Sequence, residues 1–229
     1  MNEPLVSLII PAYNRAALLP ATLASVFAED YPAKEIIVVD DGSTDETAAV
    51  CARFPVRFFH QKNRGPGAAR NFGAAQSRGE LLVFLDSDDI CPAGSLRQRV
   101  EHWQRDPHYA QVTGRLRLFQ EDTPGRMIFI HAENEAVHCV SNGSDVILRH
   151  AFEKAGGFDE NLRSWEDWEL WMRLRELGFQ QKLIPETCLF YRRHAGNMSE
   201  DRVQANHGIL AMLHGTMQRR RRQQLRASL

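Results

Sequence analysis

Strand-like and helix-like patterns alternate through residues 1–90. Short, nearly continuous apolar runs predict strands that are covered on both faces, and helical spacing follows the first three of them. Repeated strand–helix–strand units of this length imply right-handed crossovers and a parallel sheet. The predicted strands are residues 5–10, 35–39, 56–60 and 81–85.

The second half of the chain is less regular. Residues 112–118, 127–130 and 189–193 are predicted strands, and a helix is predicted over 164–178 with tryptophans on one side. A final helix is predicted from about residue 199 into the arginine run 219–222. We find no internal repeat and no linker rich in Pro, Gly or Ser, so the sequence predicts a single α/β domain with a tail.

Composition excludes several classes of function. The formal net charge of −1 gives no global basicity, so nucleic acid is not expected as a partner. The four cysteines lie far apart, without zinc-site spacing, and are expected to be reduced thiols. The N-terminal apolar run follows no basic stretch and is broken at Pro11, which argues against a signal peptide or a membrane span. A cytoplasmic protein is therefore expected.

Three aspartates follow the fourth predicted strand, in the order Asp86-Ser87-Asp88-Asp89. Side chains two apart on an extended chain project to the same face, so Asp86 and Asp88 can meet one ion if the chain stays extended. Carboxylate oxygens without a nearby cysteine suit Mg²⁺ or Mn²⁺, which keep open positions for phosphate oxygens. The alternative interpretation is a polar turn that caps the next helix.

A second acidic turn, Asp40-Asp41-Gly42-Ser43, follows the second predicted strand. Asp-Gly predicts a turn, and Ser43 with Glu46 predicts a capping box for the next helix. Asp40 is then left to accept the N–H of a nucleobase at the carboxyl end of its strand, where ligands collect in parallel sheets. Arg70, on a later helix, is either a cationic contact to base or phosphate or a solvated side chain.

Two carboxylates, Glu166 and Asp167, stand between tryptophans at the start of the predicted helix 164–178. The helix dipole favours acidic side chains in a first turn, so capping alone accounts for them. A carboxylate held between bulky aromatic side chains is also partly desolvated, as general bases are. The dipole lowers the pKa of Asp167 and burial raises it, so the pattern leaves the direction of the shift open.

Five blocks of the chain, in order, closely resemble the family-two glycosyltransferases of the GT-A fold. They are VSLIIPAYNR (6–15), IIVVDDGSTDET (36–47), NRGPGAARNFG (63–73), ELLVFLDSDD (80–89) and GGFDENLRSWEDWELW (156–171). The ordered set is far more specific than any one block. The resemblance implies a Rossmann-like, mixed and mainly parallel sheet, flanked by helices in a single domain.

The resemblance also implies an activity and a site. The activity is transfer, with inversion, of a sugar from a nucleotide-diphosphate donor, usually UDP-linked, to an acceptor hydroxyl. Asp167 would be the catalytic base and Glu166 an acceptor contact. Mn²⁺ or Mg²⁺ would bind Asp86 and Asp88, with His194 on the metal or diphosphate, or merely exposed in a loop. The residues implied around the donor are Pro11, Ala12, Tyr13, Asp40, Arg70, Asp86 and Ser87.

By the same resemblance, residues 1–205 form the glycosyltransferase domain. Its nucleotide-binding half is 1–90, and its acceptor-binding half, 91–205, takes a glycan or lipid-linked acceptor. Residues 206–229 form a basic helical tail. The arginines of this tail predict either a solvated helix end or docking to an anionic membrane surface.

Two other functions stay open on the residues alone. A sugar nucleotidyltransferase would share the sheet and the acidic metal site, but its glycine-rich phosphate loop is absent after the first strand, where residues 11–15 contain no glycine. The second is a nucleotide-sugar-binding module without catalysis. The presence of Asp86, Asp88 and Asp167 argues against it.

Overall fold

The computed structural model describes residues 3–123, 125–130, 135–139, 141–197, 209–219 and 221. Its strands are β1 (Val6–Ala12), β2 (Lys34–Asp40), β3 (Arg57–His60), β4 (Leu81–Phe84), β5 (Gln111–Thr123), β6 (Arg126–Phe129), β7 (Asp145–Leu148) and β8 (Gln181–Arg192). Its named helices are α1 (Leu19–Phe27), α2 (Thr47–Cys51), α3 (Pro66–Gln76), α4 (Ser95–Arg105), α5 (Arg149–Ala155) and α6 (Glu166–Glu176).

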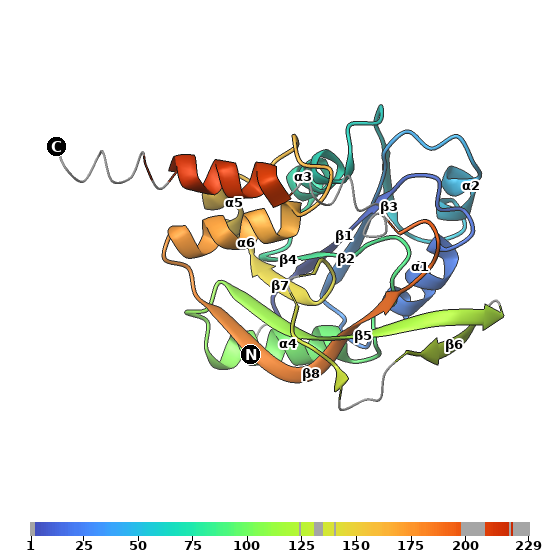
Figure 1. Cartoon of the computed structure of the whole chain (residues 1–229). Coiled ribbons are helices and arrows are strands. Elements are labelled where there is room, and N and C mark those ends of the chain that lie inside the picture. The colour runs from blue at the N-terminus through green and yellow to red at the C-terminus, as the bar shows by residue number, and fades with distance from the viewer. Residues whose placement is uncertain are drawn as a thin grey trace.

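One mixed sheet joins all eight strands, in the order β3-β2-β1-β4-β7-β5-β6, with β8 paired to β5 (Figure 1). Strands β1 to β4 pair in parallel, as predicted. Beyond them β7 runs antiparallel to both β4 and β5, while β8 runs parallel to β5. The sheet is therefore parallel where the strand–helix repeat is regular and mixed where it is not.

Helices cover both faces of this sheet because successive side chains of a strand point to opposite sides. In β1, Leu8 and Ile10 pack with α1, α2 and α4 in one buried apolar cluster. Ile9, between them, packs in a second cluster with α3, α5 and α6. The near-continuous apolar runs of β1, β2 and β4 follow from this three-layer arrangement, whereas the edge strand β3 alternates between partly buried and exposed residues.

Strand β1 extends past its predicted end at Ile10, through Pro11 to Ala12. The carbonyl of Ile9 accepts the N–H of Leu85, so the nitrogen of Pro11, two residues on, faces the same side. Pairing with β4 has ended there, while pairing with β2 continues to Asp40. A proline is tolerated at this position because no neighbouring strand needs its missing N–H.

The capping box predicted at Ser43 and Glu46 is wrong: α2 begins at Thr47, and Glu46 occupies the N-cap position without a capping side-chain bond. The hydroxyl of Ser43 instead accepts the N–H of Asn14 at 2.9 Å. Asp45 accepts the N–H of Ala16 at 3.0 Å and that of Thr47 at 3.0 Å. The polar side chains of this turn therefore bind the loop after β1, a long-range contact that local capping rules do not include.

The second half contains elements that the sequence patterns do not predict, namely α4, β7 and α5. The predicted late strand 189–193 is only the end of β8. Strands β5 and β6 and helix α6 are confirmed, with α6 starting at Glu166. All four cysteines are free thiols, as expected.

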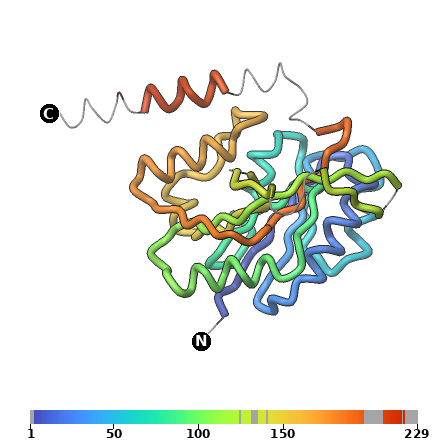
Figure 2. Tube along the Cα trace, turned by 60° about the horizontal axis from the view of Figure 1, so that its bottom comes forward, coloured from blue at the N-terminus to red at the C-terminus, as the bar shows by residue number. Residues whose placement is uncertain are grey.

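The final helix lies beside α6 in both views (Figures 1 and 2) and is described over residues 209–219. Arg219 donates to Glu176 at 2.9 Å and to Glu169 at 2.8 Å, which ties this helix to α6. The predicted start of the helix near residue 199, and Arg220 and Arg222 of the arginine run, lie outside the described residues. None of the helices in the described ranges is long and apolar enough to cross a membrane.

Gly73 allows the close approach of α3 to the sheet, and its replacement tests this packing. A Cβ at Gly73 would lie 2.5 Å from Cγ2 of Ile9 and 3.1 Å from Cγ2 of Val39. We expect Gly73→Ala to lower the free energy of unfolding by about 1–3 kcal/mol in urea titrations. At Gly215 a Cβ meets nothing closer than 3.5 Å. Gly215→Ala should therefore be neutral or stabilising, and equal effects of the two would contradict this account.

Candidate active site

The predicted site residues gather at the carboxyl ends of β1, β2 and β4 and at the start of α6. Hydrogen bonds hold the loop after β1 against the loop after β2. Asn14, with a φ of 51°, accepts the N–H of Thr44 at 2.8 Å, and the N–H of Arg15 donates to Thr47 at 2.9 Å. These bonds fix one wall of the site by joining two loops that are about thirty residues apart.

The residues predicted around the nucleotide differ in their exposure and in their hydrogen-bond partners. The side chain of Tyr13 is exposed, whereas Pro11 and Ala12 are buried in β1. Asp40 is buried, accepts the N–H of Ser43 at 2.9 Å and pairs with Nδ1 of His60 at 3.0 Å. Tyr13 and the largely exposed His60 are thus the side chains with which a planar base can make contact.

The acidic sequence after β4 turns instead of staying extended, because the N–H of Asp89 bonds to the carbonyl of Asp86 at 3.2 Å. Asp86 and Asp88 therefore have different partners. Asp86 binds Arg70, while Asp88 lies 3.0 Å from Nε2 of His194 and 3.5 Å from Arg15. The Ser87 side chain is buried. An extended chain was the condition under which one ion could meet both carboxylates, and the segment forms a turn instead.

Arg70 joins the end of β4 to the start of α6. Its guanidinium is buried and donates to Asp86 at 2.6 Å and to Glu166 at 2.6 Å, above the ring of Phe158. Burial opposes its charge, but the two carboxylates raise the pKa of Arg70 above its ordinary value. A solvated helix position, one of the two readings of Arg70, is therefore wrong.

Glu166 and Asp167 open helix α6 as the sequence predicts, with their orientation set by Trp165. Trp165 occupies the N-cap in a left-handed conformation, φ 66°, that a bulky residue rarely adopts. Glu166 is buried against Arg70, while Asp167 is partly exposed and accepts the N–H of Trp168 at 2.8 Å. Of the two, Asp167 is the carboxylate that a bound molecule can reach.

Burial raises the pKa of Asp167 to about 8, and the neighbouring charges of Glu166 and Asp86 add to the effect. The N–H of Trp168 and the charge of Arg70 oppose it. Burial also raises the pKa of Asp86, and that of Asp89 well above the ordinary value. The site thus carries more carboxylate charge than its arginines compensate, a setting that a divalent cation relieves.

Within the described ranges, no group of three or more His, Cys, Asp or Glu side chains is arranged to hold a metal ion. Asp88 nevertheless offers an oxygen that is not tied to a buried arginine, which suits an ion that takes its remaining ligands from phosphate and water. The N–H of Gly196 donates to Nδ1 of His194 at 3.1 Å, so Nε2 carries the proton and donates to Asp88. His194 would bind a metal only after its proton moves to Nδ1 and this bond breaks.

Three residues of the site were not singled out from the sequence: Arg15, Asp89 and Arg192. Asp89 is buried and accepts the N–H of Arg192 at 2.8 Å, and Arg192 donates to the carbonyl of Asp88 at 2.6 Å. These contacts tie the acidic turn to the end of β8. Their positions along the chain could have pointed to two of them. Arg15 is the last residue of the block 6–15 that resembles the family, and Arg192 lies two residues before His194.

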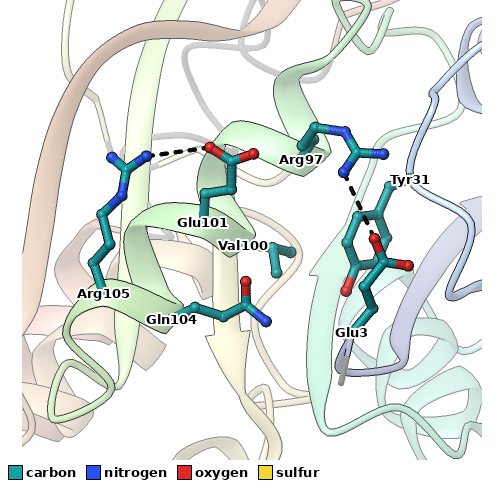
Figure 3. A pocket seen from close by; sticks show the side chains of 7 residues that line it. All are labelled: Glu3, Tyr31, Arg97, Val100, Glu101, Gln104 and Arg105. Carbon is teal, nitrogen blue, oxygen red and sulfur yellow. Dashed lines mark hydrogen bonds and ion pairs between the residues drawn. The ribbon is translucent and has the colours of Figure 1, made fainter. Parts of the chain in front are cut away.

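A cavity of about 590 Å³ lies beside this site, lined by Leu118, Gln120, Ile130, Arg193, His194 and Ala195. A second cavity, of about 560 Å³, lies near Glu3, Tyr31 and Arg97, which belong to segments at the opposite ends of the strands (Figure 3). Its charged residues pair with one another, as Arg105 does with Glu101. The first cavity is therefore the one that adjoins the acidic site, since His194 lines it and contacts Asp88.

The model of the family "Glycosyl transferase family 2" matches residues 7–170, most of the chain and all of the acidic site. The chain belongs to this family. Among the relatives of this chain, an uncharacterized glycosyltransferase of Rickettsia conorii is 42% identical over 94 residues, 39% of the chain and 16% of that protein. The succinoglycan biosynthesis protein ExoO of Rhizobium meliloti is 31% identical over 220 residues, 86% of the chain and 63% of ExoO. The chain thus spans less than two thirds of either relative.

Solved structures share the fold of this family member. The S. aureus protein TarS, residues 1–349, in complex with UDP-GlcNAc superposes with a TM-score of 0.69 at 21% identity, over 86% of the chain and 61% of that 1–349 chain. The mannosyltransferase PcManGT of Pyrobaculum calidifontis, in complex with GDP-Man and Mn²⁺, superposes with a TM-score of 0.74 at 20% identity, over 95% of the chain and 65% of PcManGT. The expected GT-A fold is confirmed.

Removing the guanidinium of Arg70 tests whether its bonds to Asp86 and Glu166 hold the site together. We expect Arg70→Met to lower the free energy of unfolding by about 3–5 kcal/mol, because it leaves the buried Glu166 without its counter-charge. Arg78, an exposed arginine paired with Glu35, provides the control. Arg78→Met should lower the free energy of unfolding by less than about 1 kcal/mol. Urea denaturation measures both, and similar losses would contradict the role given to Arg70.

Proposed function

We propose that the protein transfers a sugar from a nucleotide-diphosphate donor, usually UDP-linked in this family, to an acceptor hydroxyl with inversion at the anomeric carbon. The observation that carries the proposal is the Arg70 bridge between Asp86 and Glu166, at 2.6 Å to each. It draws the acidic turn after β4 and the carboxylate pair of α6 into one site. The family match favours this reaction over a sugar nucleotidyltransferase or a non-catalytic binding module.

In this reaction Asp167 acts as the general base. The acceptor oxygen attacks the anomeric carbon from the side opposite the diphosphate while its proton passes to Asp167. The bond from the anomeric carbon to the diphosphate oxygen breaks at the same time, and the nucleoside diphosphate leaves. Glu166 and Arg70 orient the first turn of α6, and Glu166, being buried, touches the acceptor only if this turn opens.

Donor binding is proposed at the carboxyl ends of β1, β2 and β4. The residues assigned to it from the sequence are Pro11, Ala12, Tyr13, Asp40, Arg70, Asp86 and Ser87. The exposed ring of Tyr13 would contact the base, while Pro11 and Ala12 shape the floor. The complex of TarS with UDP-GlcNAc supports a UDP-sugar, and that of PcManGT with GDP-Man keeps GDP as the alternative. The acceptor, a glycan or lipid-linked molecule, would enter by the cavity that Leu118 and Ile130 line.

Asp88 is the proposed ligand of Mn²⁺ or Mg²⁺, and Asp86 and His194 would join it only after their bonds to Arg70 and to Asp88 break. The Mn²⁺ in the PcManGT complex and the excess of carboxylate charge at this site support it. When bound, the ion neutralises charge that develops on the diphosphate. Arg15, 3.5 Å from Asp88, can contribute to the same neutralisation.

Asp167→Asn tests the base. We expect sugar transfer to fall by at least about 100-fold, because no group accepts the hydroxyl proton, while donor binding in a thermal-shift assay stays the same. For the unsubstituted enzyme kcat/KM should fall as the pH drops below about 8, because Asp167 becomes protonated. Near-normal turnover of Asp167→Asn would contradict the assignment.

The same variant should be more stable at neutral pH. A carboxyl with a raised pKa favours folding below its ordinary pKa, and this contribution is lost as the pH rises through about 8. Asparagine removes the cost of a buried charge, so we expect at least about 1 kcal/mol of added stability at pH 8 and little change at pH 4. Glu46→Gln, at an exposed position, should show no such pH dependence.

Asp88→Asn tests the metal. Thermal-shift titrations with UDP-GlcNAc and GDP-mannose, each with and without Mn²⁺, should show a Mn²⁺-dependent shift for the unsubstituted protein. We expect Asp88→Asn to lower the affinity for donor by about tenfold or more in the presence of Mn²⁺ and to leave the metal-free affinity unchanged. An equal affinity with Mn²⁺ would contradict the ligand role of Asp88.

A further inference from the structure

The helix of residues 209–219 has one face committed to the domain. Met212 and Thr216 on this face are buried, and the Thr216 hydroxyl lies 3.9 Å from the sulfur of Met172 on α6. Arg219 closes the contact through its bonds to Glu169 and Glu176. Positions 212, 216 and 219 follow helical spacing, so a single stripe makes these contacts.

The outer face of the same helix carries a second apolar stripe. Leu210, Leu213 and Met217 are 65%, 45% and 67% exposed, among the large apolar side chains that the described residues leave uncovered. Their spacing of three and four residues places them on one side. His214 and Gln218, which hydrogen-bond to each other at 3.1 Å, flank this stripe with polar groups. We call Leu210, Leu213 and Met217 the outer stripe.

Positive charge accompanies the outer stripe. No Asp or Glu follows Asp201 in the sequence, whereas Arg219, Arg220, Arg221, Arg222 and Arg226 do. Since the whole chain has a net charge of −1, this charge is local. Arg219 is bound to α6, and Arg221 is exposed. An exposed apolar face that is followed in the sequence by a run of cations is the pattern of a helix that lies in the interface of an anionic bilayer.

We propose that the outer stripe and the arginines that follow it dock this protein onto an anionic lipid surface. The apolar side chains enter the boundary of headgroups and acyl chains, and the arginines pair with lipid phosphates. A second copy of the chain would also cover the stripe, but it would gain nothing from the arginines, which repel one another. The docking is independent of the proposed transfer reaction, although it would bring α6 and Asp167 close to a lipid-linked acceptor.

Co-sedimentation of the full chain with vesicles tests the proposal. We expect binding to 3:1 phosphatidylcholine–phosphatidylglycerol vesicles, at least tenfold weaker binding to pure phosphatidylcholine, and loss of binding at high salt. The variant Leu210→Gln, Leu213→Gln, Met217→Gln should bind at least tenfold more weakly. Its control is Leu177→Gln with Leu183→Gln, which removes side chains of similar exposure elsewhere, 51% and 55%, and should leave binding unchanged.

Replacing Arg220, Arg221 and Arg222 with glutamine should remove the preference for anionic vesicles, since each arginine near the surface strengthens binding about fivefold. Circular dichroism and thermal melting confirm that every variant is folded. Equal binding to both vesicles, or equal binding by the outer-stripe variant, would overturn the proposal. A concentration-dependent dimer in light scattering that the outer-stripe variant abolishes, without vesicle binding by either, would assign the stripe to a second copy and also overturn it.

Discussion

The arrangement of the site depends on one buried cation. Arg70 comes from α3 and binds carboxylates from two other parts of the chain, Asp86 after β4 and Glu166 at the start of α6. A planar guanidinium can hold two carboxylates at once, whereas a lysine ammonium is a point charge on a flexible stem. Because charge buried without a partner is costly, all three segments are constrained to one relative position. Asp167 is held in place by the same constraint, one residue from Glu166.

The parallel half of the fold could be predicted because its information is local. Strands β1, β2 and β4 are short runs of mostly apolar residues that end at polar turns, and β3, with its two phenylalanines, also ends at a polar loop; helical spacing follows the first three strands. Strand β7 and helix α5 escaped prediction because β7 has four residues and passes directly into α5, with no turn residue between them. The pairing of β7 between β4 and β5 is a property of the folded chain, which periodicity along the sequence does not contain.

The sequence motifs singled out most of the residues that line the candidate site, but not the partners of these residues. The motifs pointed to Asp86, Asp88 and Asp167, and the structure gathers the turn and the helix that carry them around Arg70. The turn at Asp89 and the bonds of Ser43 to the loop after β1 depend on contacts between distant segments. A strand-end rule treats each terminus alone, so it left open whether the acidic segment stays extended or turns, and it assigned a cap to Ser43.

The early end of the β1–β4 ladder has a consequence for the shape of the sheet. Beyond Leu85 the two central strands part, and β1 continues beside β2 alone. A strand that diverges in this way could close again by adding one more rung, but Pro11 has no hydrogen with which to form it. The proline therefore leaves the β1–β4 ladder without a donor at its acidic rim, where the pairing stops. A β4 lengthened by insertion could donate to the carbonyl of Pro11 but would receive no bond from its nitrogen, so each added pair there would be weaker than in the rest of the sheet.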